Sequence, residues 1–261
     1  MLEALSPQRR RAVLGAGGLA LLLMVVLTGL VAVRTRGGGS APVPQDVPGP
    51  VLLVPGYGGN LSSLAPLAEA LRSAGRTPVL VAPVGNGTGD LRVQAAHLGE
   101  VAEEAVGTGA PSVDVVGFSA GGVVARLWVR EYKGGGIARR VLTLGSPHHG
   151  TGQAELGAGL AGGCPVGCQQ LMRDSDLLRR LNAGDETPVG PAWATVRTTA
   201  DQVVTPVDSA ALEGALNLVV QDLCPGSTAA HGDLTRHPVV LAALGSVLGS
   251  GPPAAPSRVR C

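Results

Sequence analysis

The segment that decides the fold is Val113-Asp114-Val115-Val116-Gly117-Phe118-Ser119-Ala120-Gly121-Gly122. It begins with a mostly apolar run that is typical of a buried strand, and the residues from Gly121 to Tyr132 have a pattern that is typical of a helix. Between the two stands a G-x-S-x-G motif centred on Ser119, whose small residues let the chain reverse sharply and raise the serine hydroxyl above the strand end. Because the chain is rich in glycine, the motif by itself is a weak signal, which an ordinary turn would also explain. With the strand before it and the helix after it, the motif indicates a reactive serine.

Strands and helices alternate on both sides of this motif. The run Val51–Val54 is apolar on both faces, as expected for a parallel strand that is covered by helices, and it stops at Pro55-Gly56. The sequence predicts further strands over 79–81, 113–116, 141–144, 193–198 and 216–220, and helices over 64–71, 91–106 and 121–132. Such alternation predicts the α/β class, with a mostly parallel central sheet flanked by helices.

The chain divides into four parts by composition. Residues 1–36 contain an uncharged apolar run from Ala12 to Val33, and we expect a transmembrane anchor or a signal segment there. Residues 37–50 are rich in Gly and Pro and predict a flexible linker. Residues 51–248 predict the folded domain, with a short cap-like or lid-like insertion at about 146–190, and residues 249–261 predict a disordered tail.

The charges around the apolar run favour an anchor that is not cleaved. Arg9 to Arg11 precede the run and only Arg34 and Arg36 follow it closely, which places the N-terminus inside and the domain outside the cytoplasm. The predicted location is therefore the cell membrane, as a single-pass protein with an extracytoplasmic domain. A long cleavable signal peptide, which would make the protein secreted, and a buried soluble helix are the alternatives.

The composition argues against a nucleic-acid partner. The chain has 20 basic and 19 acidic residues, and several of the basic ones lie before residue 49 or in the tail, so the folded part is mildly acidic. With two Trp, two Tyr and one Phe, the chain also has few side chains on which bases could stack. We expect that the protein has no nucleic-acid partner and that it is a monomer.

In these motifs the sequence resembles the α/β-hydrolase family, and in particular its bacterial lipase and esterase branch. The resemblance covers about residues 50–248. The segment Val54–Gly59 (Val-Pro-Gly-Tyr-Gly-Gly) is similar to the oxyanion loop of the family, although Pro55 stands where a His is more usual, and Leu144–Gly150 resembles the segment after the next core strand. The resemblance implies the α/β-hydrolase fold and a serine hydrolase that cleaves carboxylic esters.

A serine hydroxyl needs a histidine to take its proton, and the histidine needs a carboxylate to orient it. The family order is Ser, acid, His, which implies Ser119 as the nucleophile, Asp201 as the acid after the strand 193–198, and His231 as the base before the terminal helix. Asp208 and Asp222 compete for the role of the acid. His237 competes for the role of the base, although a position that caps the terminal helix suits it better.

The remaining expectations concern the oxyanion hole, metals and the cysteines. The resemblance implies the backbone N–H groups of Tyr57 and Ala120 as oxyanion donors, with Gly117 and Gly121 leaving room for the turn around the nucleophile. No cofactor and no metal are expected, although zinc on Cys164, Cys168 and the pair His148/His149 is an alternative. A local Cys164–Cys168 disulfide is favoured, and the alternative is a bond from Cys224 that ties the insertion to the loop before His231.

The predicted function is a lipase or esterase that acts on a small-molecule or lipid ester through an acyl-enzyme. An acyltransferase or a thioesterase would use the same three residues with a different acceptor or substrate. From another class, a non-catalytic binding module could retain the same fold, but such a module should have lost at least one of the three groups, and all three are present.

Overall fold

The computed structural model describes residues 24, 43–154 and 163–261. The chain forms two units, Met1–Ala41 and Pro42–Cys261. Except for Met24, the predicted span from Ala12 to Val33 lies outside the described residues. Among the residues that are described, no helix combines the length and the apolar character needed to cross a membrane.

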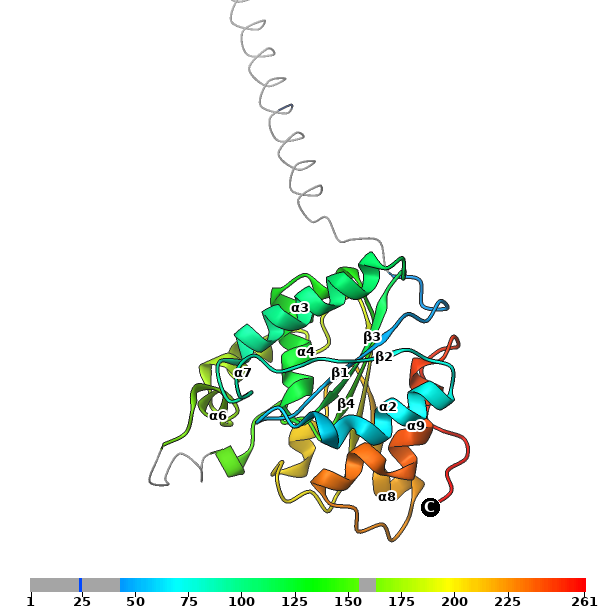
Figure 1. Ribbon diagram of the computed structural model, residues 1–261. Helices are drawn as coiled ribbons and strands as arrows, with labels where there is room; N and C mark the ends of the chain where they lie inside the picture. The colour runs from blue at the N-terminus through cyan, green and yellow to red at the C-terminus, as the bar shows by residue number, and fades with distance from the viewer. Residues whose placement is uncertain (1–23, 25–42, 155–162) are drawn as a thin grey trace, which may run out of the picture. The chain divides into compact units, whose positions relative to one another are not determined.

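A single parallel sheet of six strands forms the centre of the second unit (Figure 1), in the order β2-β1-β3-β4-β5-β6. The strands are β1 (Val51–Val54), β2 (Pro78–Leu80), β3 (Val113–Phe118), β4 (Ala138–Leu144), β5 (Ala192–Arg197) and β6 (Leu216–Val219). All neighbouring pairs are parallel, for example with Leu53 opposite Val116 between β1 and β3. The predicted α/β class and mostly parallel sheet are confirmed.

Helices cover both faces of this sheet and separate two apolar cores. One face carries α3 (Leu91–Gly107) and α4 (Ala120–Glu131), and the other carries α2 (Ala65–Ser73) and α9 (Pro238–Leu248), as Figure 1 shows. Strand β1 is buried on both faces, and it is apolar along its whole length (Val51–Val54). The shorter helical turns are η2 (Leu61–Leu64), η3 (Gly134–Gly136), η4 (Val207–Ala210), α8 (Val220–Leu223) and η5 (His231–Arg236).

The predicted insertion lies between β4 and β5 and contains α6 (Val166–Gln170) and α7 (Asp176–Leu181). Cys164 and Cys168 form a disulfide there, as the favoured local pairing predicts. Arg126 of α4 is buried and donates hydrogen bonds to the carbonyl oxygens of Leu181 and Glu186, which holds the far end of the insertion against the domain. Burial lowers the pKa of Arg126 to about 10, and the charge of Glu186 opposes that effect.

The described parts of both flanking segments, residues 43–50 and 249–261, contact the domain, where the sequence predicts a flexible linker and a disordered tail. In the linker, Val43 is buried, and the carbonyl oxygen of Gln45 accepts hydrogen bonds from Arg139 and Arg140 of β4. In the tail, Cys261 forms a disulfide with Cys224, so Cys224 does not tie the insertion to the loop before His231.

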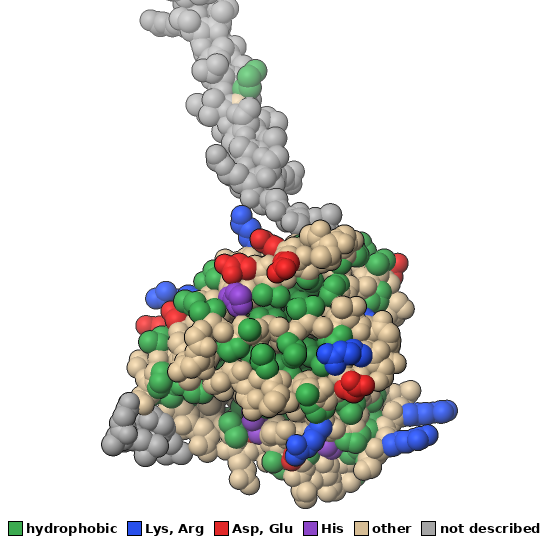
Figure 2. Space-filling model, viewed as in Figure 1, with side chains coloured by type: hydrophobic (Ala, Val, Ile, Leu, Met, Phe, Trp, Pro, Cys, Tyr) green, Lys and Arg blue, Asp and Glu red, His purple; other side chains and the backbone are tan. Residues whose placement is uncertain are grey.

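Three arginines hold these segments to the end of α9. Arg76, Arg139 and Arg140 donate hydrogen bonds to carbonyl oxygens at or just after its last turn, where the helix dipole is negative. Asp114 of β3 is fully buried and pairs with Arg76 and Arg139 at 2.6 and 2.5 Å. This network lies at the amino ends of the strands, away from Ser119. Figure 2 shows acidic and basic side chains spread in small groups over the face that it draws.

Candidate functional site

Ser119 stands between the end of β3 and the start of α4 in a strained backbone conformation. Its φ of 53° and ψ of −125° lie in a region that residues other than glycine rarely adopt. The turn is held by a hydrogen bond of 2.8 Å from the Ser119 amide to the carbonyl oxygen of Leu144, at the end of β4. Such strain is found at functional sites when the surrounding structure fixes it.

Three glycines make this turn possible by letting backbones approach closely. A Cβ at Gly117 would lie 2.6 Å from the backbone of Gly122, and a Cβ at Gly121 would lie 2.4 Å from the carbonyl oxygen of Val54. Both glycines belong to the G-x-S-x-G motif of the sequence. Gly122 has the same requirement, because a Cβ there would lie 2.1 Å from the hydroxyl oxygen of Ser146.

The structure brings Asp201 and His231 together, although 30 positions separate them in the chain. Nδ1 of His231 lies 2.7 Å from Oδ2 of Asp201, and both residues are buried. The other carboxylate oxygen of Asp201 accepts hydrogen bonds of 2.8 Å from the amides of Val203 and Val204. These two bonds fix the plane of the carboxylate and leave one oxygen for the histidine.

His231 packs next to the residues that flank Ser119. The centroid of its ring lies 5.0 Å from that of Phe118, the residue before Ser119. A Cβ at Gly145, which follows Leu144, would lie 3.0 Å from Nδ1 of His231. Since the amide of Ser119 bonds to Leu144, His231 and Ser119 lie over the carboxyl ends of the same two strands, β3 and β4.

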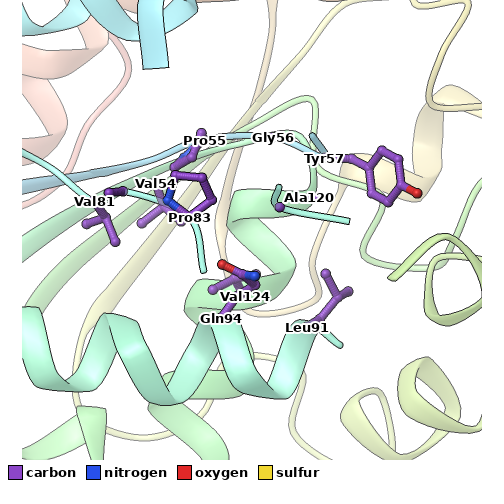
Figure 3. A pocket seen from close by; sticks show the side chains of 12 residues that line it. Val54, Pro55, Gly56, Tyr57, Val81, Pro83, Leu91, Gln94, Ala120 and Val124 are labelled. Carbon is purple, nitrogen blue, oxygen red and sulfur yellow. The ribbon is translucent and has the colours of Figure 1, made fainter. Parts of the chain in front are cut away.

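The loop after β1 approaches Ser119 from the other side. A Cβ at Gly56 would lie 3.1 Å from Cβ of Ser119. Tyr57 and Ala120, the two predicted oxyanion donors, line one pocket (Figure 3) together with Gly56. Among the described residues, no backbone carbonyl accepts a hydrogen bond from the amide of Tyr57 or Ala120. The ring of Tyr57 is partly exposed and points away from Pro83 and Val81 on the far wall.

Two residues that the sequence analysis missed join the loop of Asp201 to the loop of His231. The hydroxyl of Thr198, fully buried after β5, donates to the carbonyl oxygen of Ala229 at 2.8 Å. Gln221 donates to that hydroxyl at 2.9 Å and to the carbonyl oxygen of Ser227 at 3.0 Å. Nothing in the local sequence identifies these side chains, because the contacts join segments that are distant in the chain.

The other candidates for the acid and the base make different contacts from those of Asp201 and His231. The carboxylate of Asp208 is exposed and pairs with Arg197 at 3.2 Å, and Asp222 is exposed. His237 caps α9, where its Nδ1 accepts a hydrogen bond from the amide of Val239. Burial lowers the pKa of His237, with Asp233 opposing that effect.

The side chains of His148 and His149 have partners other than Ser119. His148 is completely buried against Thr143, with Nε2 at 3.0 Å from its hydroxyl, and His149 pairs with Glu186 at 2.6 Å. The disulfide between Cys164 and Cys168 removes the two thiolates that the zinc alternative needs. The described residues contain no group of His, Cys, Asp and Glu that could hold a metal ion.

Comparison with known proteins agrees with this architecture. No family model matches the sequence, and no curated protein matches it. Among solved structures, lipase B of Aspergillus fumigatus superposes with a TM-score of 0.68 at 20% identity, covering 81% of this chain and 55% of that chain. The mature lipase BlEst2 of Bacillus licheniformis gives a TM-score of 0.65 at 17% identity and covers 80% and 96% of the two chains.

The chain has the α/β-hydrolase fold. The resemblance inferred from the motifs is thus confirmed at the level of the fold. A lipase-esterase related protein from Clostridium acetobutylicum is similar as well, with a TM-score of 0.52 at 13% identity over 73% of this chain and 90% of that one. The α/β-hydrolase domain spans about half the length of the Aspergillus lipase.

Proposed function

We propose that this α/β-hydrolase is a serine hydrolase that cleaves carboxylic esters, as a lipase or esterase. The observation that carries the proposal is the contact of 2.7 Å between Asp201 and His231, which lie at the same sheet edge as the strained Ser119. Fold alone does not determine function, but a serine, a histidine and a carboxylate at this edge are what acyl transfer needs. The solved structures with the same fold include two lipases and a lipase-esterase related protein.

In the proposed reaction, Ser119 attacks the ester carbonyl carbon while His231 takes the proton of its hydroxyl. Asp201 holds the imidazole in the tautomer with the proton on Nδ1, so that Nε2 is free to act as the base, and it stabilises the imidazolium that forms. His231 then gives the proton to the leaving alcohol. Water, activated by the same histidine, releases the acid from Ser119 and restores the enzyme.

The amides of Tyr57 and Ala120 are the proposed donors to the oxyanion of the tetrahedral intermediate. Two features support this role: both residues line one pocket beside Ser119, and neither amide donates to a backbone carbonyl of the described residues. The start of α4 adds the positive end of a helix dipole at the same point. Each such donor stabilises the transition state by about 3–4 kcal/mol.

We further propose that the domain works outside the cytoplasm. The structure pairs all four cysteines, as Cys164–Cys168 and Cys224–Cys261, and such bonds persist in oxidising compartments.

The decisive experiment compares the full-length protein with Ser119→Ala on p-nitrophenyl acetate, together with labelling by a fluorophosphonate. We expect the wild-type protein to hydrolyse the ester and to be labelled on Ser119, and the variant to do neither. Equal rates in the two proteins would instead favour the non-catalytic binding module. Faster transfer to an added alcohol than to water would favour an acyltransferase, and faster cleavage of a matched thioester would favour a thioesterase.

A further inference from the structure

The pocket beside Ser119 belongs to one half of the sheet. Its walls come from the loops after β1 and β2 and from the facing sides of α3 and α4, and none of them comes from β4, β5 or β6. Asp201 follows β5, and His231 packs against Gly145 at the end of β4. The pocket and the Asp201–His231 pair therefore lie on opposite sides of β3, which carries Ser119 at its end.

This arrangement orients an ester on the proposed nucleophile. The leaving alkoxide must lie next to His231 to receive its proton, so the alcohol part lies over β4 and β5. The carbonyl oxygen must face the amides of Tyr57 and Ala120. The third substituent of the carbonyl carbon, the acyl chain, is then directed to the side of β1 and β2, into the pocket.

We propose that this pocket binds the acyl chain, that it accepts only chains of a few carbons, and that Gln94 limits its depth. The inference rests on the proposed ester hydrolysis and adds the class of substrate, namely esters of short carboxylic acids. Its first support is size. The pocket has a volume of about 20 Å³, and one water requires about 10–15 Å³ on this scale.

The second support is the way Gln94 is fixed across the pocket. Gln94 belongs to α3, and its side-chain amide donates to the carbonyl oxygen of Val84 at 3.0 Å and accepts from the amide of Val84 at 2.9 Å. With both ends of the amide bound to one residue, the side chain cannot swing away without losing two hydrogen bonds. Gln94, Val124 and Pro83 all line the pocket (Figure 3).

The third support is the close packing of the opposite wall. The loops after β1 and β2 touch, because a Cβ at Gly59 would lie 2.4 Å from the ring of Pro83. The amide of Gly58 also donates to the carbonyl oxygen of Gly87 at 3.2 Å. Lengthening the pocket therefore requires either a shift of both loops or the release of Gln94.

The test is the chain-length profile of the full-length protein on p-nitrophenyl acetate, butyrate, hexanoate and octanoate. We expect kcat/KM to be highest for acetate or butyrate and to fall by about tenfold or more by octanoate. A single methylene that a hydrophobic pocket does not fit already lowers kcat/KM by about 10 to 200-fold. The variant Gln94→Ala should shift the optimum to longer chains. Gln94→Leu, which keeps a similar volume but loses both hydrogen bonds to Val84, should shift it less than Gln94→Ala does.

Val93→Ala is the matched control, because Val93 is the preceding residue of α3 and its side chain is 49% exposed. Its profile should equal that of the wild-type protein. Activity that is as high on octanoate as on acetate would overturn the inference and leave ester hydrolysis intact, as would a Gln94→Ala profile that matches the control. A wild-type protein with no activity on any chain length and no fluorophosphonate label on Ser119 would instead overturn the proposed function itself.

Discussion

The hydroxyl of Thr198 donates a hydrogen bond of 2.8 Å to the carbonyl oxygen of Ala229. Thr198 lies three positions before Asp201, and Ala229 lies two positions before His231. This bond, together with the bond from Gln221 to the same hydroxyl, joins the loop of the proposed acid to the loop of the proposed base.

The first prediction follows from this bond. Thr198→Val keeps the shape of the side chain but removes the hydroxyl that donates to the carbonyl of Ala229 and that accepts from the side chain of Gln221 and the amide of Ala200. We expect a loss of about 1–3 kcal/mol in the free energy of unfolding and a fall in kcat of about 10 to 100-fold from misplacement of His231, with KM little changed. Urea unfolding and steady-state kinetics measure both. Thr198→Ser should restore most of the rate, and a Ser variant as slow as the Val variant would contradict the role of the hydroxyl.

The second prediction concerns Gly145, which has a φ of +53° and touches His231. In Gly145→Ala the new Cβ would lie 3.0 Å from Nδ1 of His231 and 2.7 Å from Leu234, so the imidazole must shift. We expect a fall in kcat/KM of about 100-fold. Gly75→Ala is the matched control, because its φ of +72° imposes a similar backbone strain and its Cβ would meet nothing within 4 Å. Similar activity in the two variants would show that the added methyl group does not displace the imidazole of His231.

The third prediction concerns acid stability. His148 is completely buried, and that burial, with the charges of Arg126 and His149, lowers its pKa well below 6.5. Its Nδ1 has no hydrogen-bond partner among the described residues. The unfolded chain binds a proton below pH 6.5 and the folded one does not, so His148 stabilises the fold above pH 6.5 and this contribution is lost as the pH falls.

We therefore expect that His148 lowers the free energy of unfolding by up to about 1.4 kcal/mol per pH unit once the pH falls below the pKa of this histidine in the unfolded chain. His148→Gln, which keeps a nitrogen near Thr143, should show a smaller decrease between pH 7.5 and pH 5. His97→Gln, at a partly exposed position on α3, serves as the control. Identical pH dependence in all three proteins would refute the assignment.

The fourth prediction separates the two disulfides. Cys224–Cys261 closes a loop of 37 positions that contains His231 and α9, whereas Cys164–Cys168 closes one of only 4. Because the stabilisation rises with loop length, replacing Cys224 and Cys261 by Ser should cost about 2–4 kcal/mol, and replacing the other pair should cost less. Thermal unfolding of both double variants gives the comparison. A larger loss from the Cys164/Cys168 pair would be contrary to this expectation.

Most of the sheet and the larger helices could be predicted from the sequence. Val51–Val54 and the predicted strand 141–144 lie within β1 and β4, and the predicted helix 91–106 lies within α3. These patterns are local, because a strand buried on both faces is mostly apolar and a helix packed on a sheet repeats its apolar side chains every three or four residues. The G-x-S-x-G motif is equally local, since the chain cannot turn there unless Gly117 and Gly121 are small.

The sequence by itself thus determined the α/β class, the alternation of strands and helices, and the turn that carries Ser119. Only the tertiary structure decided what meets around that turn: the contact between Asp201 and His231, the Thr198 bridge, and the Gln94 side chain across the pocket. It also placed residues 43–49 and Cys261 against the domain. The physical reason is range, because secondary structure follows from neighbours a few positions apart, whereas a site depends on distances between segments that only the packed sheet brings together.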